Sequence, residues 1–209
     1  TSSAGEIIWF VGCGNMAGAM VAGWRLAGTD FNRSVAIRPS GTPVEGVRTV
    51  RSLGEAGRQP DLMVLGFKPQ ALDEIAPTLT SWITSECTVV SILAGVEAAG
   101  LRARFPRAAA IVRAMPNLPV AIRRGVVALY SPHETDALRE RMLRLFSPLG
   151  YAAWCASEAE FGAVGSVSGA GPAYVARFIA ALAAAGEKRG LDPVIALTVA
   201  RETVLGTGW

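Results

Sequence analysis

The chain has 209 residues, of which 51% are hydrophobic and 18% charged, and this composition excludes a disordered or collagen-like protein. The formal net charge is only +3 and the basic residues are spread along the chain, so a nucleic-acid partner is not expected. A single histidine and three widely spaced cysteines argue against a histidine-based catalytic triad, a disulfide framework and a metal site.

The longest uninterrupted apolar stretch covers residues 178–185. It is far shorter than the ~20 residues that span a bilayer, so no membrane segment is expected. Three cysteines without a paired spacing fit a reducing compartment, and we therefore expect a cytoplasmic protein.

Short apolar runs of strand length recur through the first 130 residues, with helical patterns between several of them. The runs are Ile7–Val11, Ser34–Ile37, Leu62–Phe67, Thr88–Leu93, Ala109–Val112 and Val126–Tyr130. Residues 14–27 and 70–82 are the clearest helices. Continuous apolar strands that alternate with helices predict a mostly parallel sheet buried on both faces, which is the doubly wound α/β fold of Rossmann type.

From residue 158 onward, alanine-rich helical patterns replace the strands, so we expect a dinucleotide-binding domain over residues 1–157 and a small all-helical domain over residues 158–209. One helix is predicted to begin with Pro172 at its first position and to stop at Gly190. A second is predicted to begin at Pro193 with Asp192 as its cap. Two or three such apolar helices cannot close a core of their own, which predicts packing against another subunit in a homodimer or higher homo-oligomer.

A glycine-rich turn follows the first strand and opens the first helix, with the spacing G-x-G-x-x-A from Gly12 to Ala17. The first glycine permits a tight turn, the second lets a pyrophosphate approach the backbone, and the helix N-terminus holds the anion. An ordinary strand-to-helix turn is the alternative interpretation. The dinucleotide interpretation predicts these cofactor-binding residues: Val11, Gly12, Cys13, Gly14, Asn15 and Met16.

The end of the second strand indicates which dinucleotide is bound. No acidic residue, which would bind the ribose hydroxyls of NAD, occurs between Phe31 and Val44. The strand instead ends with Arg38 and Ser40, a guanidinium and a hydroxyl suited to a 2′-phosphate, so NADP(H) is the expected cofactor. A solvated arginine without a ligand is the alternative for Arg38.

Five separate stretches of this sequence resemble the pattern of the pyrroline-5-carboxylate reductase family. They are Gly12–Ala17, Gly66-Phe67-Lys68-Pro69-Gln70, Ser91–Gly95, Arg113-Ala114-Met115-Pro116-Asn117 and Ser168–Tyr174. The first four follow predicted strands at their carboxyl ends, where open α/β sheets bind ligands. The resemblance implies further cofactor contacts at Gly66, Lys68, Pro69, Ala94, Met115 and Asn117, and substrate contacts at Ser168, Gly169, Ala170 and Gly171.

The resemblance implies an NADP-dependent oxidoreductase that transfers a hydride to the imine carbon of 1-pyrroline-5-carboxylate and gives L-proline. A protonated imine is already electrophilic, so such catalysis depends mainly on proximity and electrostatics. Ser168 as a mere helix cap, and the Met115 to Asn117 stretch as a plain turn, are the structural alternatives.

The sequence departs from the family pattern at several positions. The family's Ser-Pro-Gly-Gly-Thr-Thr stretch, which binds substrate and carries the proposed proton donor, has no counterpart here, so no catalytic residue is named and a truncated or divergent member with an incomplete helical domain is expected. Leu53 replaces a cofactor-binding asparagine, Ala170 a serine and Gly165 a threonine. A non-catalytic NADP-binding relative is therefore the main alternative. A β-hydroxyacid dehydrogenase relative is a weaker one, because Lys188 lies too far along its helix.

Overall fold

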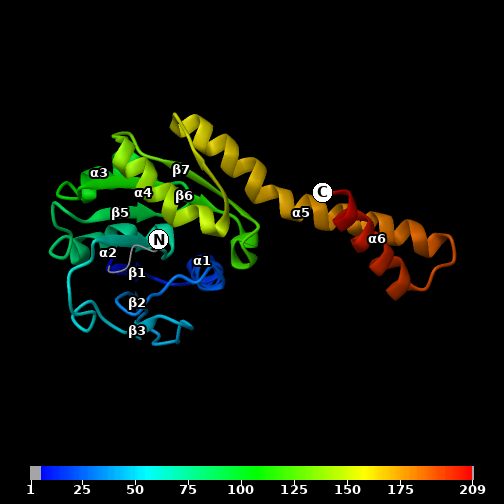
Figure 1. Ribbon diagram of the computed structural model, residues 1–209, viewed down its shortest axis with the longest axis horizontal. Coiled ribbons are helices and arrows are strands. Elements are labelled where there is room, and N and C mark those ends of the chain that lie inside the picture. The colour runs from blue at the N-terminus through cyan, green and yellow to red at the C-terminus, as the bar shows by residue number, and fades with distance from the viewer. Residues whose placement is uncertain (1–5, 209) are drawn as a thin grey trace. The chain divides into compact units, whose positions relative to one another are not determined.

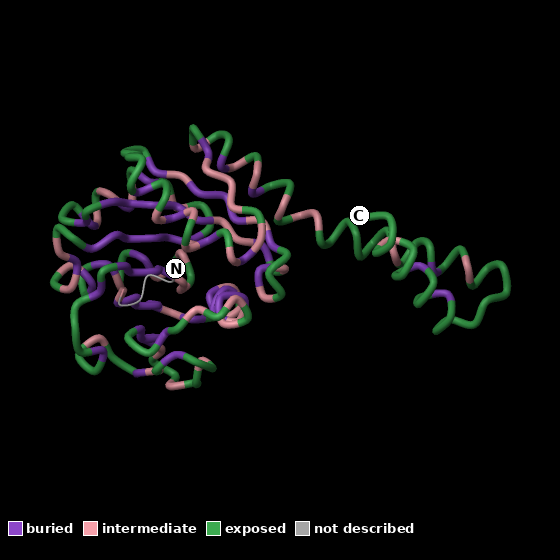
Figure 2. Tube along the Cα trace, in the orientation of Figure 1, coloured by how far each residue is buried: buried purple, intermediate pink, exposed green. Residues whose placement is uncertain are grey.

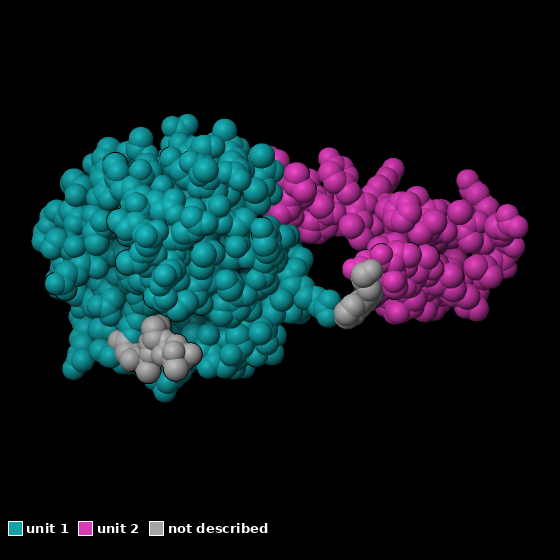
Figure 3. All heavy atoms as spheres, turned by 45° about the horizontal axis from the view of Figure 1, so that its top comes forward, with its two compact units in different colours: residues 1–165 teal, residues 166–209 magenta. Residues whose placement is uncertain are grey.

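The computed structural model describes residues 6–208. The chain divides into two compact units, Thr1–Gly165 and Ser166–Trp209, which Figure 3 distinguishes by colour. Helix α5 (Glu158–Lys188) begins in the first unit and continues into the second.

The described strands of the first unit form one eight-stranded sheet in the order β3-β2-β1-β4-β5-β6-β7-β8 (Figure 1). Their bounds are β1 Ile8–Val11, β2 Val35–Ile37, β3 Arg48–Val50, β4 Leu62–Leu65, β5 Thr88–Ser91, β6 Ala110–Pro116, β7 Gly125–Tyr130 and β8 Gly150–Trp154. Every neighbouring pair is parallel except β6 and β7. The strand order reverses between β1 and β4, and this is the topological switch point at which doubly wound sheets bind ligands.

Helices cover both faces of this sheet. Because successive strand residues point to opposite faces, Phe10 and Val64 pack with α1 (Asn15–Leu26) and α4 (Asp136–Phe146). Trp9 and Met63 pack with α2 (Leu72–Leu79) and α3 (Ala98–Arg104) on the other face. The central strands are accordingly buried throughout (Figure 2). The predicted doubly wound α/β fold is confirmed.

Three short 3-10 helices complete the first unit: η1 Pro69–Ala71, η2 Leu118–Ile122 and η3 Ser147–Leu149. All six predicted strands are present, with ends shifted by a few residues and with β6 extended to Pro116. Both predicted crossover helices are present as α1 and as η1 followed by α2.

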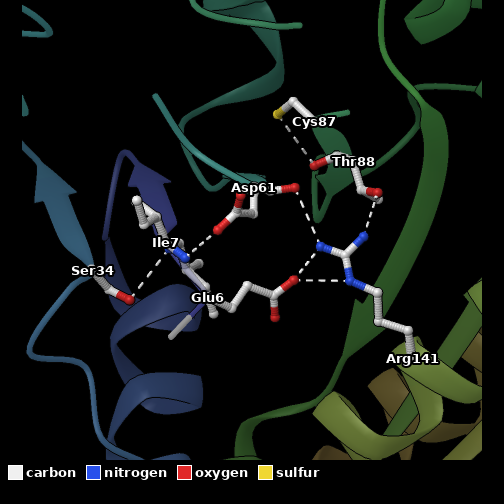
Figure 4. A network of polar contacts seen from close by, with 8 residues as sticks. Glu6, Ile7, Ser34, Asp61, Cys87, Thr88 and Arg141 are labelled. Carbon is white, nitrogen blue, oxygen red and sulfur yellow. Dashed lines mark hydrogen bonds and ion pairs between the residues drawn. The ribbon is translucent and has the colours of Figure 1, made fainter. Parts of the chain in front are cut away.

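A polar network holds the amino ends of the strands together (Figure 4). The Arg141 guanidinium, on α4, pairs with the Glu6 carboxylate and donates hydrogen bonds to Thr88 Oγ1 at 2.8 Å and to the Asp61 carbonyl at 3.2 Å. The Asp61 carboxylate accepts the N–H of Ile7 at 2.7 Å. The network therefore joins α4 to the starts of β1, β4 and β5, at the edge of the sheet opposite to their carboxyl ends.

In the second unit, the later part of α5 packs against α6 (Pro193–Thr207) through a small alanine core. Ala183, Ala196 and Ala200 are buried there, and a Cβ on Gly186 would lie 3.3 Å from the Ala196 Cβ. The predicted start of α6 is confirmed, because Asp192 Oδ1 accepts the N–H of Val194 at 2.9 Å.

Large apolar side chains of the second unit are solvent-exposed: Val167, Tyr174, Val175, Phe178, Leu182, Val194, Ile195, Leu197, Val199 and Leu205. Phe178, for example, is 57% exposed. Although its uninterrupted apolar run is short, α5 is the one described helix that is long and apolar enough, by length and composition, to cross a membrane. An exposed apolar face of this size is typical of a surface that packs against a partner.

The predicted start of α5 at Pro172 is wrong. The helix begins at Glu158, and Pro172 lies inside it. The start is set by a reciprocal cap, in which Ser157 Oγ accepts the Glu160 N–H at 3.1 Å and Glu160 Oε2 accepts the Ala156 N–H at 2.7 Å. The arrangement is close to a Ser-x-x-Glu capping box, except that the carboxylate accepts the N–H of the residue before the serine.

Candidate functional site

The turn between β1 and α1 has the geometry that a dinucleotide-binding turn requires. Gly12 has φ +73°, which favours glycine, and a Cβ there would lie 2.8 Å from the Phe67 Cβ. A Cβ on Gly66 would lie 2.4 Å from the Gly12 carbonyl oxygen. Glycine at both positions therefore lets the turn after β1 and the segment after β4 lie directly against each other.

Gly14 differs from these two glycines, because a Cβ on Gly14 would have no heavy atom within 4 Å. Gly14 precedes α1 without a side-chain cap, and the first turn of α1 contains no acidic residue. The N–H groups of Asn15 and Met16 thus begin a helix whose positive end faces open space, which favours an anion.

A cleft of about 350 Å³ lies beside this turn. Its lining residues are Cys13, Gly14, Asn15, Gly18, Val21, Ala22, Arg25, Arg38, Pro43, Val44 and Glu45. Four predicted cofactor residues, from the first turn and from the end of β2, are therefore brought together in one cleft. Burial raises the pKa of the Cys13 thiol to about 11, against a smaller opposing effect of Arg38, so Cys13 lines the cleft as a neutral thiol.

Arg25 and Glu45 were missed in the sequence. Arg25 Nη2 and Glu45 Oε1 form an ion pair at 2.8 Å between α1 and the loop after β2. No local sequence pattern links the two residues. Their pairing follows only from where α1 and the loop after β2 lie in the fold. The pair neutralises the one acidic group of the cleft, so the unpaired charge that remains there is the guanidinium of Arg38.

Arg38 and Ser40 lie in the turn that follows β2. Arg38 Nη1 donates a hydrogen bond to the Thr42 carbonyl at 3.0 Å, and the Ser40 and Thr42 hydroxyls are 2.9 Å apart. Arg38 forms no ion pair with an acid in the part of the chain that the structure describes. The end of β2 therefore combines a half-buried guanidinium with two hydroxyls.

The other predicted cofactor residues follow neighbouring strands of the sheet. Lys68 and Pro69 follow β4, Ala94 follows β5, and Met115 lies at the end of β6. Lys68 and Ala94 are exposed, and Lys68 has no ion-pair partner among residues 6–208. The parallel arrangement of β1, β4, β5 and β6 places all these segments at one edge of the sheet.

Asn117 has a structural contact of its own. Its Oδ1 accepts the Val126 N–H at 2.8 Å, and its N–H donates to the Val126 carbonyl at 3.1 Å. The side chain therefore braces the connection between β6 and β7. A contact of Asn117 with a cofactor remains a prediction.

The side chain of Met115 lies directly against Gly165 in the first unit. A Cβ on Gly165 would lie 2.1 Å from the Met115 Sδ and 2.5 Å from its Cε. The thioether of Met115 thus fills the volume that a larger residue at position 165 would need. This contact gives a physical reason for the glycine that departs from the family pattern.

A charged contact joins β6, α3 and α5. Glu158 Oε1 accepts a hydrogen bond from Arg113 Nη1 at 2.9 Å and another from the Ala98 N–H at 2.9 Å. The Arg113 guanidinium also lies 4.4 Å from the centre of the Phe161 ring. Burial alone would raise the pKa of the Glu158 carboxyl, but the hydrogen bonds from Ala98 and Arg113 outweigh it and hold the pKa below its usual value.

We expect Glu158→Gln to lower the free energy of unfolding by about 1–2 kcal/mol at pH 7, because the buried Arg113 guanidinium loses its carboxylate partner. A carboxyl with a lowered folded-state pKa stabilises above its unfolded pKa, and this contribution is lost as the pH falls through the folded value. The difference between wild type and variant is therefore expected to shrink below about pH 4.5, the ordinary carboxyl value. Urea unfolding at pH 7 and pH 3.5 measures it, with Glu97→Gln as the exposed control. A pH-independent difference would contradict the charge argument.

The predicted substrate residues have a different local structure from the one expected. Ser168, Gly169, Ala170 and Gly171 lie within α5, in the second unit, and not in a turn that precedes a helix. The alternative of Ser168 as a helix cap is therefore wrong, because no helix begins directly after it. Cβ atoms on Gly169 and Gly171 would have no heavy atom within 4 Å, so the backbone of α5 is accessible there.

No group of three or more histidine, cysteine, aspartate or glutamate side chains within residues 6–208 has a geometry that could hold a metal ion. The sheet topology and the glycine turn with its open helix N-terminus at the switch point define a dinucleotide-binding protein of the Rossmann class.

Comparisons with known proteins specify the family. The family model "NADP oxidoreductase coenzyme F420-dependent" matches residues 7–95, and the model "Pyrroline-5-carboxylate reductase dimerisation" matches residues 158–208. The pyrroline-5-carboxylate reductase of Pseudomonas aeruginosa is 35% identical over 206 residues, which cover 95% of this chain and 76% of that protein. The chain belongs to the pyrroline-5-carboxylate reductase family.

Solved structures agree with this assignment. A pyrroline-5-carboxylate reductase from Coxiella burnetii has a TM-score of 0.86 and 28% identity, over 97% of this chain and 78% of that one. The Plasmodium falciparum enzyme, solved with NADP bound, has a TM-score of 0.85 over 97% of this chain and 77% of that one, and at 24% identity it supports the fold alone.

Proposed function

We propose that the chain binds NADP(H) at the carboxyl edge of its sheet and reduces the cyclic imine 1-pyrroline-5-carboxylate to L-proline by hydride transfer. The observation that carries the proposal is the cleft that joins the turn after β1 to Arg38 at the end of β2. The family to which the chain belongs supplies the reaction, and the matched model for NADP oxidoreductases supports the cofactor.

The residues of the cleft fit NADP(H). Open space beside Gly14 admits a pyrophosphate against the N–H groups that begin α1. The 2′-phosphate would lie at the end of β2, where Arg38 and Ser40 provide a guanidinium and a hydroxyl. Glu45, the one acid that lines the cleft, is neutralised by Arg25 and does not repel the phosphate.

When bound, NADPH supplies the hydride for the reaction. The chain's own part is to bind and orient the two reactants. Ala94 after β5 and Met115 at the end of β6 are proposed to border the nicotinamide, because β5 and β6 neighbour β4 at the same edge of the sheet. Gly66, Lys68 and Pro69 are proposed to contact the cofactor after β4. The residue that protonates the imine nitrogen is not assigned.

We propose that the stretch from Ser168 to Gly171 contacts the substrate, as the family resemblance implies, with the Ser168 hydroxyl as its side-chain hydrogen-bonding group. The proposed macromolecular partner is a second copy of the chain rather than lipid. The exposed apolar residues of α5 and α6 support this, as does the match of residues 158–208 to a dimerisation model. Light scattering of the purified chain is expected to give a dimer or a larger oligomer, and a monodisperse monomer would contradict it.

The proposed location is the cytoplasm, which the three buried, unpaired cysteines support.

The decisive experiment follows NADPH oxidation by the purified chain with 1-pyrroline-5-carboxylate and measures L-proline as the product, with NADPH binding measured separately by fluorescence. We expect binding and proline formation. Binding without proline formation would instead support the non-catalytic NADP-binding alternative. Absence of binding would remove the cofactor assignment as well.

The cofactor preference gives a separate prediction. Arg38→Asp is expected to weaken NADPH binding about 100-fold, because a charge-assisted hydrogen bond is lost and a like charge faces the phosphate. NADH affinity is expected to change less than about threefold, since NADH has no 2′-phosphate. Titration of both cofactors with wild type and variant measures the ratio. Equal losses for NADPH and NADH would remove the 2′-phosphate assignment from Arg38.

A further inference from the structure

We infer that Arg51 is a second residue that recognises the 2′-phosphate of NADP(H), together with Arg38 at the turn after β2. The inference rests on the proposed function, because it concerns the same cofactor. Arg51 lies in no recognised motif of the sequence. The inference gives it a contact that determines cofactor specificity.

The strand register brings the two arginines to the same place. β2 and β3 are parallel neighbours in which Ile37 pairs with Val50, so Arg38 and Arg51 each follow the last residue of their strand. The Arg38 N–H donates a hydrogen bond to the Val50 carbonyl at 2.8 Å. Residues 13 positions apart in the sequence thus lie side by side at the carboxyl edge of the sheet.

The side chain of Arg51 lies against the turn that holds Ser40. Gly41, in that turn, has φ +69°, and a Cβ on it would lie 2.6 Å from the Arg51 Nε and 3.0 Å from its Nη2. The Arg38 guanidinium contacts the same turn through the Thr42 carbonyl. Two guanidinium groups therefore contact one short turn whose side chains include two hydroxyls.

The charge of Arg51 is available for a ligand. Its guanidinium makes no hydrogen bond and no ion pair with any residue of the described part of the chain. The nearby acid, Glu55, instead accepts hydrogen bonds from the Ser52 hydroxyl and from the backbone N–H of Arg51. The resulting local excess of positive charge suits a phosphate monoester, which carries close to two negative charges at neutral pH and three acceptor oxygens.

The position of Arg51 relative to the cleft agrees with this role. The cleft is lined by Arg38 and not by Arg51. A 2′-phosphate projects away from the ribose, so one guanidinium inside the cleft and another beyond it at the same turn would contact the phosphate from two directions. Guanidinium forks match phosphate oxygens in pairs, which makes two arginines an effective set of donors.

The test uses 2′,5′-ADP (adenosine 2′,5′-bisphosphate) and 5′-AMP as probes, because these fragments differ only in the 2′-phosphate and need neither hydride transfer nor substrate. Isothermal titration of the full chain is expected to show 2′,5′-ADP binding about tenfold more weakly to Arg51→Gln than to wild type, with 5′-AMP affinity unchanged within twofold. Arg51→Lys, which keeps the charge, is expected to recover part of the loss. Arg58→Gln is the matched control, since it removes an exposed arginine near Arg33, in a hollow separate from the cleft.

The outcomes separate this inference from the proposed function. If wild type and Arg51→Gln bind 2′,5′-ADP tightly and with equal affinity, the role of Arg51 is overturned. NADP(H) then remains the proposed cofactor. An equal loss for 2′,5′-ADP and 5′-AMP would also overturn it, because the effect would then not come from the 2′-phosphate. Wild type that binds neither fragment nor NADPH would overturn the proposed function itself.

Discussion

The Gly14→Val variant is expected to fold like wild type and to lose NADPH and NADH binding together, by more than about 100-fold. Gly14 has φ −79° and ψ −158°, an extended conformation that valine adopts readily. A Cβ there meets no heavy atom within 4 Å, so the side chain would extend into the open space before α1. That space is where the pyrophosphate would lie, and both dinucleotides contain this group.

Thermal unfolding and fluorescence titration measure the two effects separately. The melting temperature is expected to stay within about 2 °C of wild type, because no packed contact is disturbed. Gly206→Val serves as the control, since it also places its Cβ in open space, on α6 of the second unit. Retained binding of either cofactor by Gly14→Val would show that the dinucleotide does not use this turn.

Gly66→Ala is expected to have the opposite pattern, with a large loss of stability. Its Cβ would lie 2.4 Å from the Gly12 carbonyl oxygen and 3.1 Å from the Ala17 Cβ. The first of these is a backbone atom, so the whole turn after β1 must shift. Overpacking a core costs about 1–3 kcal/mol per added group, and we expect a loss at the upper end, about 3 kcal/mol.

Urea unfolding measures this loss, with the buried Trp9 and Trp24 as fluorescent reporters of the first unit. A loss of 3 kcal/mol corresponds to a fall in melting temperature of roughly 6–12 °C for a protein of this size. Gly14→Ala provides the matched control, because it adds the same methyl group to the turn after β1, which Gly66 contacts, without a clash. Equal stability of the two alanine variants would contradict the close approach of Gly66 to Gly12.

The central part of the fold was predictable because its signals are local. Each buried parallel strand is a continuous apolar run, and the turn after β1 begins with Gly12, whose positive φ favours glycine. The edge strands escaped prediction for the same reason. β3 has one exposed, one half-buried and one buried residue, and β8 is nowhere fully buried, so neither forms an apolar run.

Site residues were predictable where they belong to one sequence motif. They were not predictable where the fold brings residues of two separate elements together. Cys13, Gly14 and Asn15 come from one motif, and Arg38 from a strand end next to it in the sheet. Arg51 became visible only through the pairing of β2 with β3, which sequence patterns do not report. The predicted start of α5 at Pro172 was wrong because proline, which favours the first position of a helix, lies inside this one.

Two separate chain segments are proposed to bind the pyrophosphate and the 2′-phosphate of the cofactor. The pyrophosphate would be held by residues 11–16, whereas both arginines that would distinguish NADP from NAD lie in residues 38–51, from the end of β2 to just past β3. Replacing residues 38–51 as one segment would change both arginines and would leave the buried core of β1, β4 and β5 untouched. We therefore expect changes within residues 38–51 to alter the coenzyme preference, in the laboratory or by natural selection, while the proposed pyrophosphate contacts stay intact.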